Sequence, residues 1–259
     1  MRVAAIYDVH ANMPALEAVV AEIECEGVDT IVVGGDVGLG PMPVATLDRL
    51  MALGDRAKFI RGNADRELVM AFDAGRRPED VVDDEDPWIR RGAWDAQQIS
   101  KRHRDFLDAL PERVTLDVDG LGTTVFCHGS PRSDEEIITP GTSDARLTEI
   151  LAGVDADVVV CGHTHMQFDR RLGRTRVVNA GAVGMPYEGR PGAYWVLLGP
   201  DVDLRRTEYD FDAAAELVRA SGYPDAKQHV ADLFLAQPGR DEVTAFFEEM
   251  AEQRSRGAS

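Results

Sequence analysis

Apolar and polar positions in the first quarter of the chain follow strand-like and helix-like patterns in turn. Residues 3–7, 30–33 and 57–60 are short apolar runs of the length of a buried strand. Between them, residues 14–27 place their apolar side chains on one helical face, and residues 45–53 also favour a helix. This β-α-β-α-β order predicts a mostly parallel sheet with helices on its faces.

The remaining chain is predicted to be helical, then rich in strands, then helical again. Residues 64–111 are interpreted as a largely helical insertion that contains an acidic, solvated loop at 79–86. We therefore expect one α/β domain over residues 1–210 and a C-terminal helical extension over 211–259, packed on the same domain and frayed from residue 254. Within these regions we expect helices at 88–101 and 103–110, strands at 114–118, 123–126, 158–160, 176–178 and 194–198, and helices at 213–220 and 242–252.

Composition excludes several classes of protein. The 259 residues carry 28 Lys and Arg against 46 Asp and Glu, a net charge of −18, which disfavours binding to a long nucleic acid or an anionic membrane. No apolar run approaches the ~20 residues of a membrane span, and we recognise no leader sequence. The three cysteines form no CxxC pair, so we expect a protein without disulfides in the cytoplasm.

Polar side chains follow five of the predicted strands at their carboxyl ends, where the ligand crevice of an open α/β sheet lies. Imidazole and carboxylate together suit divalent ions such as Mn, Fe or Zn. Seven such residues exceed the needs of one reactive ion, so they divide between two ions that share a carboxylate. Each motif alone has a structural alternative, such as a Gly-Asn turn at Asn63. The seven candidate ligands are Asp8, His10, Asp36, Asn63, His128, His163 and His165.

These residues occur in motifs that resemble the five ordered motifs of the calcineurin-like metallophosphoesterases. The segment DVHANMPALEA at residues 8–18 is similar to the small prokaryotic phosphodiesterase branch of that superfamily, and the resemblance covers roughly residues 1–198. The resemblance implies a metallo-dependent phosphatase-like, four-layer α/β sandwich, in which two facing mixed sheets are flanked by helices. The motifs are Asp8-x-His10, Gly35-Asp36, Gly62-Asn63, His128-Gly129 and Gly162-His163-x-His165.

The resemblance also implies a division of the ligands. One ion would be held by Asp8, His10 and His165, and the other by Asn63, His128 and His163, with Asp36 bridging the two. We expect Mn, with Fe, Zn or Ni as alternatives.

The expected function is metal-dependent hydrolysis of small phosphate esters, with phosphodiesters favoured. A metal-bridging hydroxide would attack phosphorus, and the ions would neutralise charge on the phosphoryl oxygens. Asp36, Asn63 and His128 are the predicted catalytic residues. Alternatives are a phosphomonoesterase or phosphoprotein phosphatase with the same site, and a metal-free scaffold of the same fold. Homo-oligomers are also compatible with the sequence.

One position departs from the pattern of many relatives. They carry a histidine directly after the motif asparagine, which is thought to protonate the leaving oxygen, and here that residue is Ala64. The source of the leaving-group proton is therefore open, and so is the partner of Asp65, for which Arg66 is one candidate. Asn12 and Arg61 are predicted substrate contacts. Their alternatives are a helix cap for Asn12 and a salt bridge for Arg61.

Two tryptophans in the predicted insertion, Trp88 and Trp94, are expected to pack it on the core. The alternative is an aromatic wall for a nucleobase.

Overall fold

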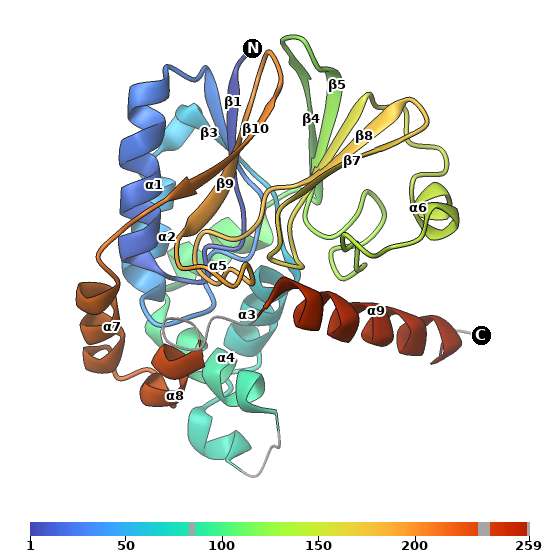
Figure 1. The fold of residues 1–259 in the computed structure, drawn as a ribbon. Coiled ribbons are helices and arrows are strands. Elements are labelled where there is room, and N and C mark those ends of the chain that lie inside the picture. The colour runs from blue at the N-terminus through green and yellow to red at the C-terminus, as the bar shows by residue number, and fades with distance from the viewer. Residues whose placement is uncertain (83–85, 233–238, 258–259) are drawn as a thin grey trace.

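Two five-stranded mixed sheets face each other, with helices outside and below them (Figure 1). This computed structural model describes residues 1–82, 86–232 and 239–257. The predicted fold class is confirmed. The first sheet has the order β10-β9-β1-β2-β3 and the second the order β4-β5-β6-β8-β7. The strands are β1 Val3–Ile6, β2 Thr30–Val33, β3 Ala57–Phe59, β4 Arg113–Val118, β5 Gly122–Cys127, β6 Val158–Cys161, β7 Phe168–Leu172, β8 Thr175–Asn179, β9 Ala193–Leu198 and β10 Val202–Thr207.

The centre of the first sheet is parallel, as predicted. Strand β1 pairs in parallel with β2, and β2 with β3, while β9 and β10 add two antiparallel strands at the other side. Ala4 and Ile6 pack with the helices outside the sheet. Val3, Ala5 and Tyr7 point the other way and pack against the second sheet. Because β1 is buried on both faces, it is uniformly apolar instead of alternating.

Helices α1 and α2 connect the first three strands, and helices α3 to α5 follow β3 in the sequence and precede β4. Helix α1 begins beside Pro14 and ends at Gly27, whose φ of 62° is the left-handed conformation that favours glycine. The predicted loop at 79–86 begins as a 3₁₀ helix over Pro78–Val81, and residues 83–85 lie outside the described part. The bounds are α1 Met13–Glu26, α2 Pro43–Met51, α3 Asn63–Asp73, α4 Pro87–Gln98 and α5 Lys101–Asp108.

The later helices are α6 Asp144–Ile150, α7 Phe211–Ala220, α8 Ala226–Val230 and α9 Arg240–Gly257. Helix α9 continues through residues 254–257, where we predicted fraying, and the final two residues lie outside the described part. It lies across the lower end of the second sheet (Figure 1). None of the described helices is long and apolar enough to cross a membrane.

Tyr7 joins the two sheets where their strands end. A Cβ at Gly34 would lie 1.9 Å from the Tyr7 ring, and one at Gly162 would lie 2.5 Å from it. The Tyr7 hydroxyl donates a hydrogen bond to the Val160 carbonyl at 3.1 Å. The loops after β2 and β6 can therefore close over this ring only as glycine, which brings both loops to the same place.

Candidate metal centre

The structure brings the seven predicted ligands together at one edge of the two sheets. Asp8 and His10 follow β1, Asp36 follows β2, and Asn63 is the first residue of α3 after β3. The imidazoles follow two strands of the other sheet: His128 comes after β5, and His163 and His165 after β6. Two groups of ligand atoms result, and within each group the atoms lie within 4.8 Å of one another. They are Asp8, His10 and His165, and Asp36, His128 and His163.

Asp36 belongs to the second group and also faces the first. Its Oδ2 is 3.3 Å from His128 Nε2 and 3.8 Å from His10 Nε2. Its other oxygen, Oδ1, accepts a hydrogen bond from the Ala64 backbone N–H at 2.8 Å. The backbone hydrogen bond fixes the carboxylate so that Oδ2 faces both groups, which is the position that a shared ligand requires.

Asn63 adjoins the group of Asp36. Its Oδ1 lies 3.2 Å from His128 Nε2. The Asn63 side chain also forms a hydrogen bond with the Glu67 carboxylate, one helical turn along α3. The carboxylate can accept only from the amide nitrogen, so the amide oxygen is left to face the ligand cluster.

Three imidazoles are oriented by backbone carbonyls. His10 Nδ1 lies 3.3 Å from the Leu39 oxygen, His128 Nδ1 lies 2.8 Å from the Gly34 oxygen, and His165 Nδ1 lies 2.7 Å from the Met185 oxygen. A carbonyl only accepts, so each Nδ1 carries a proton and each Nε2 is the nitrogen that faces the centre, where it can act as a ligand once it carries no proton. Such contacts fix the tautomer and ring orientation of metal-binding histidines.

Asp8 provides the test of whether these residues fit a cation. Its Oδ2 accepts the His163 backbone N–H at 2.9 Å. Its Oδ1 is buried and has no hydrogen-bond partner among the described residues. The nearest ring nitrogens, on His165 and His128, are 3.5 and 3.8 Å away, beyond good hydrogen-bond geometry. A buried carboxylate oxygen without a donor is unfavourable unless a cation is bound, so the donor set fits divalent ions.

Five of the seven ligands have left-handed backbone conformations. Such φ values are uncommon outside glycine and cost roughly 1–3 kcal/mol each unless the surroundings impose them. Backbone hydrogen bonds impose them here, such as His10 N–H to the Asp36 oxygen at 2.9 Å. The fold therefore positions the ligands. The five residues, with φ between 44° and 65°, are Asp8, His10, Asp36, His163 and His165.

A protein-family model described as the calcineurin-like phosphoesterase superfamily domain matches residues 1–199. The chain belongs to the calcineurin-like phosphoesterase superfamily. The resemblance inferred from the motifs is thereby confirmed, and the family together with the two ligand groups indicates divalent metal ions.

Known relatives share nearly the whole length of this calcineurin-like phosphoesterase. The uncharacterised protein MJ0912 of Methanocaldococcus jannaschii is 25% identical over 252 residues, which cover 86% of this chain and 94% of the relative. A metallophosphoesterase from Sphaerobacter thermophilus has a TM-score of 0.69 and 27% identity, covering 90% of this chain and 98% of its own. The hypothetical protein PH1004 from Pyrococcus horikoshii shares the fold, with a TM-score of 0.79, 21% identity and coverage of 92% and 99%.

The pKa of each imidazole in the centre depends on its burial and on the charged groups beside it. Burial, and after it the nearby charge of His128, lower the pKa of His163 to about 4. Burial also lowers the pKa of His10. Burial opposes the charged form of His128 as well, but Asp36 outweighs it and raises the His128 pKa to about 10. Burial likewise favours neutral Asp36, yet His128 holds the Asp36 pKa well below its usual range.

Binding of Mn²⁺ to the metal-free phosphoesterase at pH 7 is expected to release about one proton, because His128 must lose its proton to become a ligand. His163, with a pKa of about 4, contributes none. Titration calorimetry in two buffers of different ionisation enthalpy measures this number. The release should shrink towards zero above the His128 pKa of about 10. Binding at pH 7 without proton release would contradict the assignment of His128 as a ligand.

Asp65 has a role that the sequence did not reveal. Its Oδ2 accepts from the Asp36 and Gly62 backbone N–H groups at 2.8 and 2.9 Å, and its Oδ1 accepts from the Val37 N–H at 2.9 Å. Arg66, the partner that we considered, instead pairs with Asp134 and Glu135. Asp65 therefore ties the Asp36 loop to the loop that carries Asn63. Asp65 is the third residue of α3, a position where an acidic side chain often accepts a hydrogen bond from the backbone N–H of the N-cap residue. This position was the signal for the role of Asp65 that the sequence offered.

The structure supports the structural alternatives for Asn12 and Arg61. Asn12 caps α1, and its amide nitrogen donates to the Gly184 carbonyl at 3.1 Å and the Tyr209 hydroxyl at 3.2 Å. Arg61 pairs with Glu112 at 3.3 Å. Neither residue lines the cavity above the metal ligands. The contacts of these two side chains with substrate stay a prediction.

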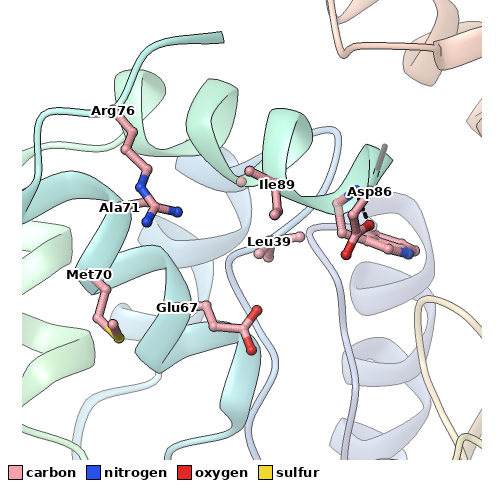
Figure 2. A pocket seen from close by; sticks show the side chains of 9 residues that line it. Leu39, Glu67, Met70, Ala71, Arg76, Asp86 and Ile89 are labelled. Carbon is pink, nitrogen blue, oxygen red and sulfur yellow. Dashed lines mark hydrogen bonds between the residues drawn. The ribbon is translucent and has the colours of Figure 1, made fainter. Parts of the chain in front are cut away.

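A cavity of about 480 Å³ opens beside the ligand cluster. Asp36, Asn63 and three of the histidines form part of its lining, and apolar side chains form much of the rest. A smaller cavity of about 190 Å³ shares part of this wall. In it, Glu67 reaches from α3 towards Leu39, beside Ile89 of α4 and Asp86, the N-cap of that helix (Figure 2).

The two tryptophans behave differently. Trp94 packs edge-on against Tyr223 with ring centroids 5.5 Å apart, as predicted for a packing residue. Trp88 is 38% exposed and lines both cavities, which favours the alternative of an aromatic wall.

Proposed function

We propose that the protein is a phosphodiesterase that uses two divalent ions, Mn²⁺ in the first instance, to hydrolyse small phosphodiesters. The position of Asp36 Oδ2 between the two ligand groups carries this proposal, because a carboxylate there can serve both ions. Fe²⁺, Zn²⁺ and Ni²⁺ suit the same mixture of imidazole and carboxylate.

The ligands divide between two positions. Asp8, His10 and His165 would hold one ion, Asn63, His128 and His163 the other, and Asp36 would be shared. When bound, a pair of ions supplies an activated water and neutralises charge on the phosphoryl oxygens. The chain itself supplies orientation: the carbonyls behind the imidazoles, the Ala64 N–H behind Asp36 and the Glu67 carboxylate behind Asn63 hold the ligand atoms in place.

One feature of the cavity wall favours diesters over monoesters, and a second favours good leaving groups. Beyond the ligands, the cavity wall carries two carboxylates, Glu67 and Asp86, and one guanidinium, Arg254, which also donates to the Glu135 carbonyl at 2.9 Å. The excess of negative charge disfavours the second negative charge of a monoester. Ala64 lines the same cavity and cannot donate a proton to a leaving oxygen, so esters with good leaving groups should react fastest. A long polyanion is disfavoured by the net charge of −18.

Removal of metal by a chelator is expected to abolish hydrolysis of bis(4-nitrophenyl) phosphate, and Mn²⁺ is expected to restore it. The same preparation should hydrolyse 4-nitrophenyl phosphate at least ~10-fold more slowly, since about 1.4 kcal/mol of repulsion gives that ratio. Elemental analysis measures the bound metal in parallel. Faster monoester hydrolysis would favour a phosphomonoesterase, protein without metal and without activity would favour a scaffold, and chelator-resistant hydrolysis would exclude the mechanism.

Placing histidine at position 64 should help substrates with poor leaving groups. Ala64 is 5% exposed and lines the cavity beside Asn63. A proton donor there is expected to raise kcat for an alkyl phosphodiester by at least ~10-fold, below the 10²–10⁴ of an evolved general acid, with little effect on the 4-nitrophenyl ester. Ala74→His at the exposed end of α3 is the matched control. An unchanged alkyl-ester rate in the Ala64→His variant would show that the proton comes from elsewhere.

A further inference from the structure

A row of aromatic rings leads from a metal ligand to the surface. The His165 and Tyr187 rings are stacked, with centroids 5.0 Å apart and an interplanar angle of 19°. The ring centroids of Tyr187 and Phe247 of α9 are 6.4 Å apart, and those of Phe247 and Phe246 are 5.7 Å apart. Tyr187, Phe247 and Phe246 all line the cavity beside the metal ligands. The row therefore begins where a phosphate would bind and ends at a phenylalanine that is 58% exposed.

Polar contacts hold α9 in this position. Near its start, Arg240 pairs with Glu188 and donates to the Gln167 carbonyl at 2.8 Å. At its middle, Glu248 accepts from the hydroxyls of Thr139 and Thr142 at 2.5 and 2.7 Å. Helix α9 is thus anchored near its start and at its middle, and its phenylalanines form a fixed wall.

The opposite wall is apolar as well. Leu39, which follows β2, and Trp88 of α4 line the same cavity. Trp88 is 38% exposed, and the Arg91 guanidinium lies 4.8 Å from the centre of its ring. Exposed aromatic side chains on two separate elements, both facing a cavity that reaches the metal ligands, are typical of a site that takes up an apolar group.

Charge and size narrow the identity of that group. Two carboxylates, Glu67 and Asp86, outnumber the one guanidinium in the wall, Arg254, which also donates to the Glu135 carbonyl, and this excess disfavours a further anionic substituent. The volume of about 480 Å³ falls within the ~300–1,000 Å³ of small-ligand sites, enough for a phosphoryl group and one or two rings. A planar neutral ring fits these conditions because it can pack against Phe247 and Tyr187.

We propose that this cavity binds phosphodiesters in which one ester group carries a planar aromatic ring, and that Phe246 and Phe247 of α9 select for that ring. This inference deepens the proposed function and rests on it for the placement of the phosphoryl group. The selecting helix lies outside residues 1–199, the part of the chain that the family model matches.

The test is a pair of monoanionic diester analogues, methyl phenylphosphonate and methyl methylphosphonate, which differ only in the group on phosphorus. Their Kd values for the Mn²⁺-loaded full-length protein are measured by calorimetry. We expect the phenyl compound to bind at least ~10-fold more tightly, from the apolar area that the ring buries. Phe247→Ala should reduce the ratio of the two Kd values to about threefold or less. Phe246→Ala should reduce it by a smaller factor, and its exposure makes it a variant that folds.

Leu217→Ala removes a side chain that is 51% exposed on α7, and it is the matched control expected to keep the wild-type ratio. Equal Kd values in the wild type, no binding of either compound, or a ratio unchanged in both phenylalanine variants would overturn the proposal. Selective phenyl binding without hydrolysis of bis(4-nitrophenyl) phosphate would leave the aromatic site standing and remove the proposed function. Hydrolysis with equal Kd values would do the reverse.

Discussion

Asp36→Asn is expected to lower kcat/KM for bis(4-nitrophenyl) phosphate by ~10³-fold or more and to leave fewer than two ions per chain. Asp36 Oδ2 lies 3.3 Å from His128 Nε2 and 3.8 Å from His10 Nε2, so the substitution removes a charge that faces both ligand groups. The size of the effect follows from the several kcal/mol that metal ions contribute to the stabilisation of charge in the transition state.

Asparagine keeps the shape of the side chain and can still accept the Ala64 N–H, so the variant should fold. Circular dichroism and thermal unfolding verify folding, and elemental analysis gives the metal content. Asp55→Asn, an exposed residue before β3, is the matched control and should keep wild-type activity and metal. More than a tenth of the wild-type kcat/KM in the Asp36→Asn variant would mean that Asp36 is not the shared ligand.

Asp65→Ala is expected to cause a large loss of stability at this edge of the fold. It would leave three buried N–H donors, on Asp36, Val37 and Gly62, without an acceptor. Each unsatisfied buried donor costs about 1–3 kcal/mol, so the free energy of unfolding should fall by about 3 kcal/mol or more. Burial and the charge of Asp36 raise the Asp65 pKa to about 6, which offsets part of the benefit of the native carboxylate.

Urea unfolding at pH 7 measures this change. Asp65→Asn provides an intermediate case, because its amide oxygen still accepts while its NH₂ group faces a donor. Asp55→Ala, an exposed residue, should change the free energy of unfolding by less than about 0.5 kcal/mol. If Asp65→Ala is as stable as that control, the three hydrogen bonds do not hold the two loops together.

The cluster of candidate metal ligands could be predicted because of where these residues stand in the sequence. Asp8, Asp36 and His128 directly follow, or closely follow, apolar runs that became β1, β2 and β5. Buried parallel strands are unmistakable as apolar runs, and the carboxyl ends of such strands meet at one edge. Sequence order alone therefore placed residues that are more than a hundred positions apart in the same cluster.

The two strands that were not predicted, β7 and β10, lie at the edges of their sheets. Their sequences, FDRRL and VDLRRT, contain charged side chains, and several of their residues are exposed. An edge strand with solvent on one side carries a weak apolar pattern, so its existence depends on the neighbour with which it pairs. Strands β8 and β9 supply those neighbours through antiparallel pairing.

Roles that depend on distant partners were also beyond the sequence. Asn12 caps α1, and its amide nitrogen donates to Gly184 and Tyr209, which lie in the other half of the chain and which no pattern around residue 12 indicates. The aromatic row depends in the same way on the approach of Tyr187 to Phe247. Such contacts are consequences of tertiary packing, which no local pattern of these residues encodes.

The left-handed backbone at Asp8, His10, Asp36, His163 and His165 restricts how this centre can be redesigned. Aspartate, asparagine, histidine and glycine tolerate that conformation better than other residues. Glutamate, glutamine or cysteine, which an engineer would choose to accommodate a larger or softer ion, would each add a backbone penalty to any gain in coordination. Few residue types can therefore be used at these five positions to change the metal preference. Larger changes must come from Asn63 and His128, whose backbones carry no such restriction.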